Sequence, residues 1–128
     1  MSKDTSRLEV ARKAYRKHTG IERASKPAPD GPASMEDLAR MLMENTYADS
    51  WARDDLDLRT KCFLSMAITA TLGTEGQFKH HLRAAHHCGV SKEEIVGMLI
   101  HFAGYLGAPR TAIARALVVE VWSEASDK

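Results

Sequence analysis

The chain has 128 residues and a formal net charge of +1, which predicts one domain and argues against nucleic acid or an acidic membrane as a partner. Its two cysteines do not form a CxxC motif, so we expect neither a disulfide framework nor a structural zinc site. The charged N-terminal segment does not resemble a signal peptide, and residues 95–109, the longest weakly polar stretch, are too short to span a bilayer. A cytoplasmic protein is the resulting expectation.

The N-terminal third predicts a helix followed by a non-helical arm. Gly20 is a suitable stop for this helix, whose apolar residues recur at helical spacing: Leu8, Ala11 and Tyr15. Residues 25–34 contain three of the four prolines and predict a linker or an ordered arm. We therefore expect an N-terminal helix and proline-rich arm in residues 1–33 and a helical domain in residues 34–128.

A second helix is expected to begin at Ser34, which can cap it, with Asp37 three residues later. The apolar stripe of this helix consists of Leu38, Met41 and Leu42. Residues 51–57 are polar and predict a loop.

The middle of the chain predicts two more helices. From Leu58 to about Gly73 the pattern is helical and apolar on most faces, so this helix should be central. Thr74 with Gln77 forms another capping-box pattern. The following helix should end at Gly89, a left-handed C-cap, and its inward residues are Phe78, Leu82 and Ala85.

The last third opens with Ser91 and Glu94, the best capping box in the chain. They precede a helix with one apolar face, made by Ile95, Leu99, Phe102 and Leu106. Pro109 suits the first turn of a last helix that reaches Trp122. Alternating strand patterns do not occur, so we predict an all-α fold with about six helices. The surplus of apolar residues indicates oligomerisation through helix faces, with a compact monomeric bundle as the alternative.

Five of the six histidines lie within residues 80–101, a clustering that suggests acid–base chemistry. His101 and Tyr105 form an i, i+4 pair on one helix. If this helix packs against the preceding one as a hairpin around Gly89, His81 and His101 face one pocket. One would then act as a general base and the other as a general acid, whereas the alternative for each is a hydrogen-bonded packing residue.

Metal binding is not expected, because no two histidines are spaced i, i+4 and no HExxH motif occurs. Cys88 lies near a helix C-terminus, where the partial negative charge raises a thiol pKa. It is interpreted as a packing residue or, beside an imidazolium, as a nucleophile. Cys62 is expected in the core and is far from Cys88 along the chain. Candidate cations for a substrate carboxylate are Arg53, Arg59, Lys61, Arg83 and Arg110.

Pieces of one family pattern occur in order over residues 47–122. Residues 89–95 match an NG-V-T-x-E-E-I turn, and an H-x-x-x-Y-x-G-x-P segment is matched by His101, Tyr105, Gly107 and Pro109. Further matching pieces are Trp51 with Arg53, Leu56, Arg59 to Lys61, Leu72 with Gly73, and His81 to Ala84. The chain thereby resembles the carboxymuconolactone decarboxylase family of the alkylhydroperoxidase-like superfamily.

This resemblance implies a helical subunit that assembles into a ring, as a trimer or hexamer, and works without a cofactor in the breakdown of aromatic compounds. The family's decarboxylases convert 4-carboxymuconolactone to 3-oxoadipate enol-lactone with loss of carbon dioxide. The resemblance assigns His81 and His101 to proton transfer and Tyr105 to a donor role. The remaining candidates are assigned to binding of the small-molecule substrate: Trp51, Arg53, Arg59, His87 and Cys88.

Some positions depart from the family pattern. The superfamily's peroxidases use a CxxC motif whose cysteine positions fall here at Thr74 and Gln77, so their thiol chemistry is not expected. The decarboxylases usually carry Asn-Asn-Gly where this chain has residues 87–89, His-Cys-Gly, and a polar Asn where it has Ala112 or Ile113. The alternatives are therefore an oxidoreductase or isomerase that acts on another small ring compound through Cys88, and a non-catalytic oligomeric binding protein.

Overall fold

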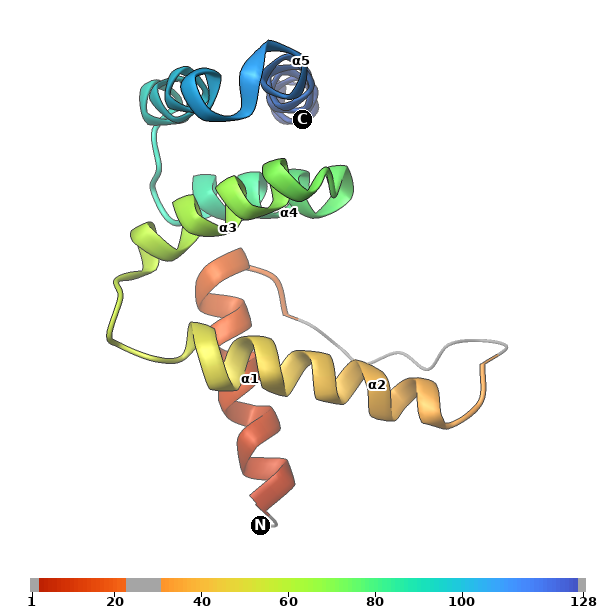
Figure 1. Ribbon diagram of the computed structural model, residues 1–128. Coiled ribbons are helices and arrows are strands. Elements are labelled where there is room, and N and C mark those ends of the chain that lie inside the picture. The colour runs from red at the N-terminus through yellow and green to blue at the C-terminus, as the bar shows by residue number, and fades with distance from the viewer. Residues whose placement is uncertain (1–2, 23–30, 127–128) are drawn as a thin grey trace. The chain divides into compact units, whose positions relative to one another are not determined.

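The computed structural model describes residues 3–22 and 31–126. These residues form helices and no strand, which confirms the all-α prediction. Contacts group the chain into two compact units, Met1–Leu56 and Asp57–Lys128 (Figure 1). The expected division at residue 33 and the ring assembly stay predictions. Among the described helices, none combines the length and the apolar character needed to cross a membrane.

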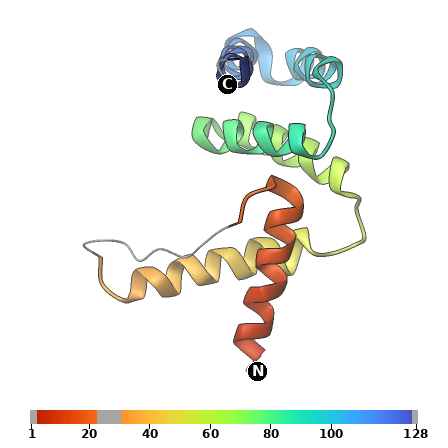
Figure 2. The same cartoon turned by 180° about the vertical axis from the view of Figure 1, so that it is seen from behind.

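The first unit contains helix α1 (Lys3–Thr19), helix α2 (Ser34–Met43) and the π-helical segment η1 (Glu44–Trp51). Segment η1 continues α2 without a break, and α1 crosses this long helix (Figure 2). A small core forms where they meet, because both helices turn aromatic and aliphatic side chains toward each other. It consists of Ala11, Tyr15, Met43 and Tyr47, with the rings of the two tyrosines edge to face at 4.9 Å.

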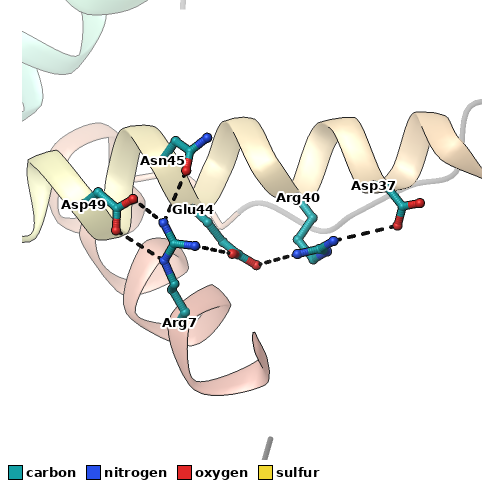
Figure 3. A network of polar contacts seen from close by, with 6 residues as sticks. All are labelled: Arg7, Asp37, Arg40, Glu44, Asn45 and Asp49. Carbon is teal, nitrogen blue, oxygen red and sulfur yellow. Dashed lines mark hydrogen bonds and ion pairs between the residues drawn. The ribbon is translucent and has the colours of Figure 1, made fainter. Parts of the chain in front are cut away.

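A buried carboxylate also joins α1 to the long helix (Figure 3). The side chain of Glu44 is 4% exposed and accepts hydrogen bonds from Arg7 at 3.0 Å and from Arg40 at 3.2 Å. Arg7 also donates to Asn45 and to the carboxylate of Asp49. Two guanidinium groups therefore compensate one buried negative charge, which offsets much of the cost of removing it from water.

Helix ends in the first unit agree with the sequence at one position and differ at another. Gly20, which follows α1, has a φ of 73°, as expected for a stop. The predicted cap at Ser34 is wrong, because the backbone of Ala33 is already helical and no side chain caps α2. Turn hydrogen bonds to the carbonyls of Pro32 and Ala33 start the helix instead. The expected loop begins one residue late, after Trp51, and residues 23–30 of the proline-rich arm lie outside the described residues.

The second unit contains α3 (Leu58–Leu72), α4 (Glu75–His87) and α5 (Lys92–Ser126). Helices α3 and α4 pack side by side, and α5 packs against both. The inward residues predicted for α4 are fully buried, which confirms that prediction, and α3 contributes Cys62, Met66 and Ala70 to the same core. Asp57 caps α3 by accepting a hydrogen bond from the backbone N–H of Thr60 at 2.7 Å.

The α4–α5 turn is confirmed in detail. Gly89 has a φ of 84°, and the Ser91 hydroxyl accepts from the Glu94 N–H while the Glu94 carboxylate accepts from the Ser91 N–H, both at 3.1 Å. The capping box predicted at Thr74 and Gln77 is wrong. The Thr74 hydroxyl donates to the carbonyl of Thr69 at 3.3 Å instead, so α4 starts without a side-chain cap.

Helix α5 consists of two segments that meet at Gly107, where φ is 80° and ψ is 166°. Pro109 stands in the first turn of the second segment, as predicted. The second segment is tied to α4 by ion pairs at 3.0 and 2.9 Å, which join Lys79 to Glu120 and Arg83 to Glu124. The α4–α5 arrangement therefore rests on polar contacts as well as on the shared core.

Candidate functional site

His81 occupies a half-buried position on α4, beside the fully buried Leu82. The rings of His80 and His81 are 5.3 Å apart between centroids. Burial, and to a smaller extent the charge of His80, lowers the pKa of His81 to about 4. The imidazole is therefore neutral at neutral pH, so it can donate one hydrogen bond and accept another but holds no extra proton to deliver.

His101 and Tyr105 form a pair on the first segment of α5, with 5.0 Å between ring centroids. Both side chains are exposed, Tyr105 to 81%. The structure thus pairs His101 with Tyr105 and His81 with His80. A pocket shared by His81 and His101 stays a prediction.

The two arginines assigned to substrate binding already contact carboxylates. Arg53 binds Asp55 through Nε at 3.0 Å and Nη2 at 2.7 Å, and this carboxylate raises the pKa of the guanidinium. Arg59 donates to the carbonyl of Gly89 at 3.2 Å and to the carboxylate of Glu94. Arg59 thereby ties the start of α3 to the α4–α5 turn, a structural role that the sequence did not suggest.

Trp51 and Arg53 belong to the first unit, whereas the other candidate residues belong to the second. The Trp51 indole stacks on the imidazole of His18, with 3.7 Å between ring centroids, and lies 5.8 Å from the Tyr47 ring. His18 is completely buried. This histidine, the one that lies outside the sequence cluster, is therefore part of an aromatic stack.

Two hollows in the second unit could take a ligand or another chain. One, of about 160 Å³, has an apolar wall that includes Phe78 and Leu117, with Arg110 and Glu75 as its charged residues. The other, of about 590 Å³, lies between the two segments of α5 and is almost entirely apolar, with Val96, Ile100, Ala112 and Val119 among its lining residues. Ile100 is 70% exposed. The second hollow is the strongest structural support for the predicted association through helix faces.

Cys62 and Cys88 influence each other, which the sequence did not predict. Burial, and after it the proximity of Cys88, raises the pKa of the Cys62 thiol to about 12. Cys88 is partly exposed at the end of α4. His87, next to Cys88, is exposed. The helical period could have placed each cysteine on an inward face, but only the packing of α3 on α4 brings the two together.

Nearly all of the candidate residues described above lie in a region that matches the model of a known protein family. The model of the carboxymuconolactone decarboxylase family matches residues 36–120, which run from α2 into the second segment of α5. The chain belongs to the carboxymuconolactone decarboxylase family. This confirms the resemblance drawn from the turn at residues 89–95 and from the His101–Pro109 segment.

One relative of this chain carries the name of a specific enzyme. Over 89 residues the chain is 27% identical to the 4-carboxymuconolactone decarboxylase of Acinetobacter baylyi. The aligned region covers 70% of this chain and 66% of the relative, so the chain spans just under two thirds of that protein's length.

Within residues 3–22 and 31–126, no group of three or more His, Cys, Asp or Glu side chains is arranged to hold a metal ion.

Proposed function

We propose that this protein is a cofactor-independent carboxy-lyase that acts on a small carboxylated lactone of the 4-carboxymuconolactone kind. The observation that carries the proposal is the family match over residues 36–120, which includes His81, His101 and Tyr105. The relative named as a 4-carboxymuconolactone decarboxylase supports the choice of substrate class. A cytoplasmic homo-oligomer, trimeric or hexameric, is part of the proposal, and the apolar hollow of α5 supports the assembly.

The reaction needs no electron acceptor. The ring carboxylate leaves as carbon dioxide, and the electron pair of the broken C–C bond moves into the conjugated lactone carbonyl. A proton is then added to a ring carbon, which regenerates the carbonyl. The protein must therefore stabilise a developing enolate oxygen and supply one proton.

The two histidines fit different parts of this task. Because His81 is neutral at neutral pH, its role in proton transfer is to accept a proton or to donate a hydrogen bond to the enolate oxygen, as a neutral imidazole does. His101, exposed and beside Tyr105, is assigned to delivery of the proton to carbon. Arg59, His87 and Cys88 are the substrate-binding candidates of the second unit, and Arg59 would exchange Glu94 for the substrate carboxylate. The roles of Trp51 and Arg53 stay predictions from the resemblance.

The test is turnover of 4-carboxymuconolactone, generated in situ, by the purified protein. Loss of the lactone and release of carbon dioxide should both be observed. His81→Ala and His101→Ala should each lower kcat by about 10²–10⁴-fold, the usual contribution of a positioned acid or base. Glu120→Ala, which removes an exposed ion pair on the same helix pair, is the matched control and should retain activity.

Circular dichroism and size-exclusion chromatography should accompany each assay. A folded oligomer that leaves the lactone unchanged would refute the proposed substrate. Full activity in both histidine variants would refute the proposed roles while leaving the substrate class intact.

A further inference from the structure

The smaller hollow of the second unit lies where α3, α4 and the second segment of α5 meet. Each of these helices contributes one buried apolar residue to its lining, and these residues form its floor: Ala70, Phe78 and Ala114. Two exposed residues of opposite charge, Glu75 and Arg110, also line the hollow. From this arrangement we propose that it binds a small zwitterion, an α-amino acid with a short apolar side chain.

Local backbone geometry places the positive group beside the hollow. The helix breaks at Gly107, and Pro109 stands in the first turn of the second segment of α5, so Arg110 is in that turn as well. Its side chain reaches the end of α3, where an added Cβ on Gly73 would lie 2.6 Å from Nη1 of the guanidinium. Because Gly73 has no side chain, the guanidinium can lie against the backbone at this end of α3.

The negative group comes from the neighbouring helix. Glu75 is the first residue of α4, three positions before Phe78, so the two residues lie on adjacent turns of one helix face. Within the part of the chain that the structure describes, the charged groups of Glu75 and Arg110 form no ion pair or hydrogen bond, with each other or with a third residue. A ligand on the apolar floor can therefore contact both charges.

The charges and the size of the hollow define the ligand. An arginine binds a carboxylate through parallel N–H donors, and a glutamate carboxylate accepts hydrogen bonds from an ammonium group. A simple carboxylic acid would leave Glu75 uncompensated, and a simple amine would leave Arg110 uncompensated. The volume of about 160 Å³ is below the range of about 300–1,000 Å³ typical of sites for drug-sized ligands. An amino acid such as valine or leucine matches both charges and the apolar floor.

This hollow is distinct from the site proposed for decarboxylation. None of the residues assigned to proton transfer or to lactone binding lines it. The negative charge of Glu75 also disfavours a ligand that carries several carboxylates and no cation. Amino-acid binding and lyase activity can therefore be tested separately, and the failure of one does not affect the other.

The experiment measures the binding of leucine to the native protein by saturation-transfer difference NMR, in which the protons of the ligand report contact with the protein. Three comparison ligands each lack one part of leucine. Isocaproate lacks the ammonium group, isoamylamine lacks the carboxylate, and glycine lacks the apolar side chain. Leucine should have the lowest Kd, and each comparison ligand should bind at least about tenfold more weakly, because it loses a charge-assisted hydrogen bond or the burial of its side chain.

Two pairs of variants locate the site. Arg110→Gln and Glu75→Gln should each raise the Kd for leucine at least about tenfold, because each removes one of the two charge contacts. Arg115→Gln is the matched control for the arginine, since Arg115 lies on the same segment but lines the larger hollow. Glu93→Gln is the matched control for the acid, since Glu93 and Glu75 each lie in the first turn of a helix. Both controls should leave the Kd unchanged.

Circular dichroism should show that all four variants are folded. The proposal is overturned if leucine does not bind the native protein at millimolar concentration, or if the Kd for leucine is the same in Arg110→Gln as in the native protein. Equal binding of isocaproate and leucine would also overturn it, because the hollow would then take a carboxylate without using Glu75. The ligand series uses the native chain, so its result does not depend on the folding of the variants.

Discussion

The indole N–H of Trp122 donates a hydrogen bond to Nε2 of His86 at 2.8 Å. Because Nε2 accepts, the neutral His86 ring carries its proton on Nδ1. The Lys92 ammonium lies 5.0 Å from the centroid of the same indole. Trp122 therefore connects the second segment of α5 both to α4 and to the start of α5.

Trp122→Phe should lower the free energy of unfolding by about 1 kcal/mol, because it keeps an aromatic ring but removes the only donor group of the indole. Urea unfolding followed by circular dichroism would measure the change. Lys92→Gln serves as the comparison and should cost about 0.5 kcal/mol, the size of an exposed cation–π contact. Equal stability of Trp122→Phe and the native protein would show that the hydrogen bond contributes nothing.

The low pKa of His81 predicts a specific loss of stability in acid. The unfolded chain binds a proton on this residue near pH 6.5, whereas the folded chain does so near pH 4. Between these values the unfolded state binds more protons, so the free energy of unfolding falls as the pH decreases. The contribution is on the order of 2 kcal/mol after allowance for the partial exposure of the ring.

His81→Gln provides the comparison, because glutamine is polar but does not titrate in this range. Unfolding free energies of both proteins should be measured from pH 7.5 to pH 4. The difference between the two curves should change steeply between pH 6.5 and pH 4. Parallel curves would contradict the buried, neutral state of His81.

Arg7→Met should destabilise the first unit by about 1–3 kcal/mol, because Glu44 would keep its buried charge and lose one of the two guanidinium groups that compensate it, while Arg40 remains (Figure 3). Thermal unfolding would measure the effect. Arg16→Met is the matched control on α1, because Arg16 pairs with Glu22 at 3.1 Å on the surface. That variant should cost less than about 1 kcal/mol. Equal losses of stability in the two variants would mean that burial of the Glu44 carboxylate does not increase the cost of removing its arginine partner.

Gly73→Ala should cost about 1–3 kcal/mol, since the residue that ends α3 has a φ of 75° and an added Cβ would lie 2.6 Å from Nη1 of Arg110. Gly76→Ala, three residues later on α4, meets no atom within 4 Å and should be neutral or stabilising by up to about 1 kcal/mol. Chemical denaturation of both variants provides the measurement.

A double variant separates the two causes of the Gly73 effect. The Arg110 side chain can move aside, whereas the backbone cannot change its φ without unwinding the helix end. Arg110→Ala in the Gly73→Ala background should therefore restore less than half of the lost stability. Complete recovery would assign the whole effect to the guanidinium.

Local signals in the sequence predicted most helix ends. The predictions at Gly20, at Gly89 and at the Ser91–Glu94 capping box were correct, because backbone conformation and near neighbours in the sequence determine where these helices begin and end. The caps at Ser34 and Thr74 failed because other partners were available: turn hydrogen bonds in the first case and a carbonyl of α3 in the second.

The candidate site was harder to predict from the sequence than the helix ends were. The helical period identified the i, i+4 pair of His101 and Tyr105, and the structure confirms that they are neighbours. It could not show that Arg59 is bound to Glu94, or that Cys88 raises the pKa of Cys62, because these interactions join residues 26 or more positions apart. Their formation depends on how α3 packs against α4 and on the turn that follows.

The family match begins at residue 36, yet the aromatic core of the first unit depends on Ala11 and Tyr15 of α1. A minimal chain cut at the start of the matched region would expose Tyr47 and Met43 to water and leave Glu44 without Arg7. Gene chimeras that exchange segments between relatives should therefore carry α1 together with α2. The smallest transferable segment of this protein is longer than the segment by which its family is recognised.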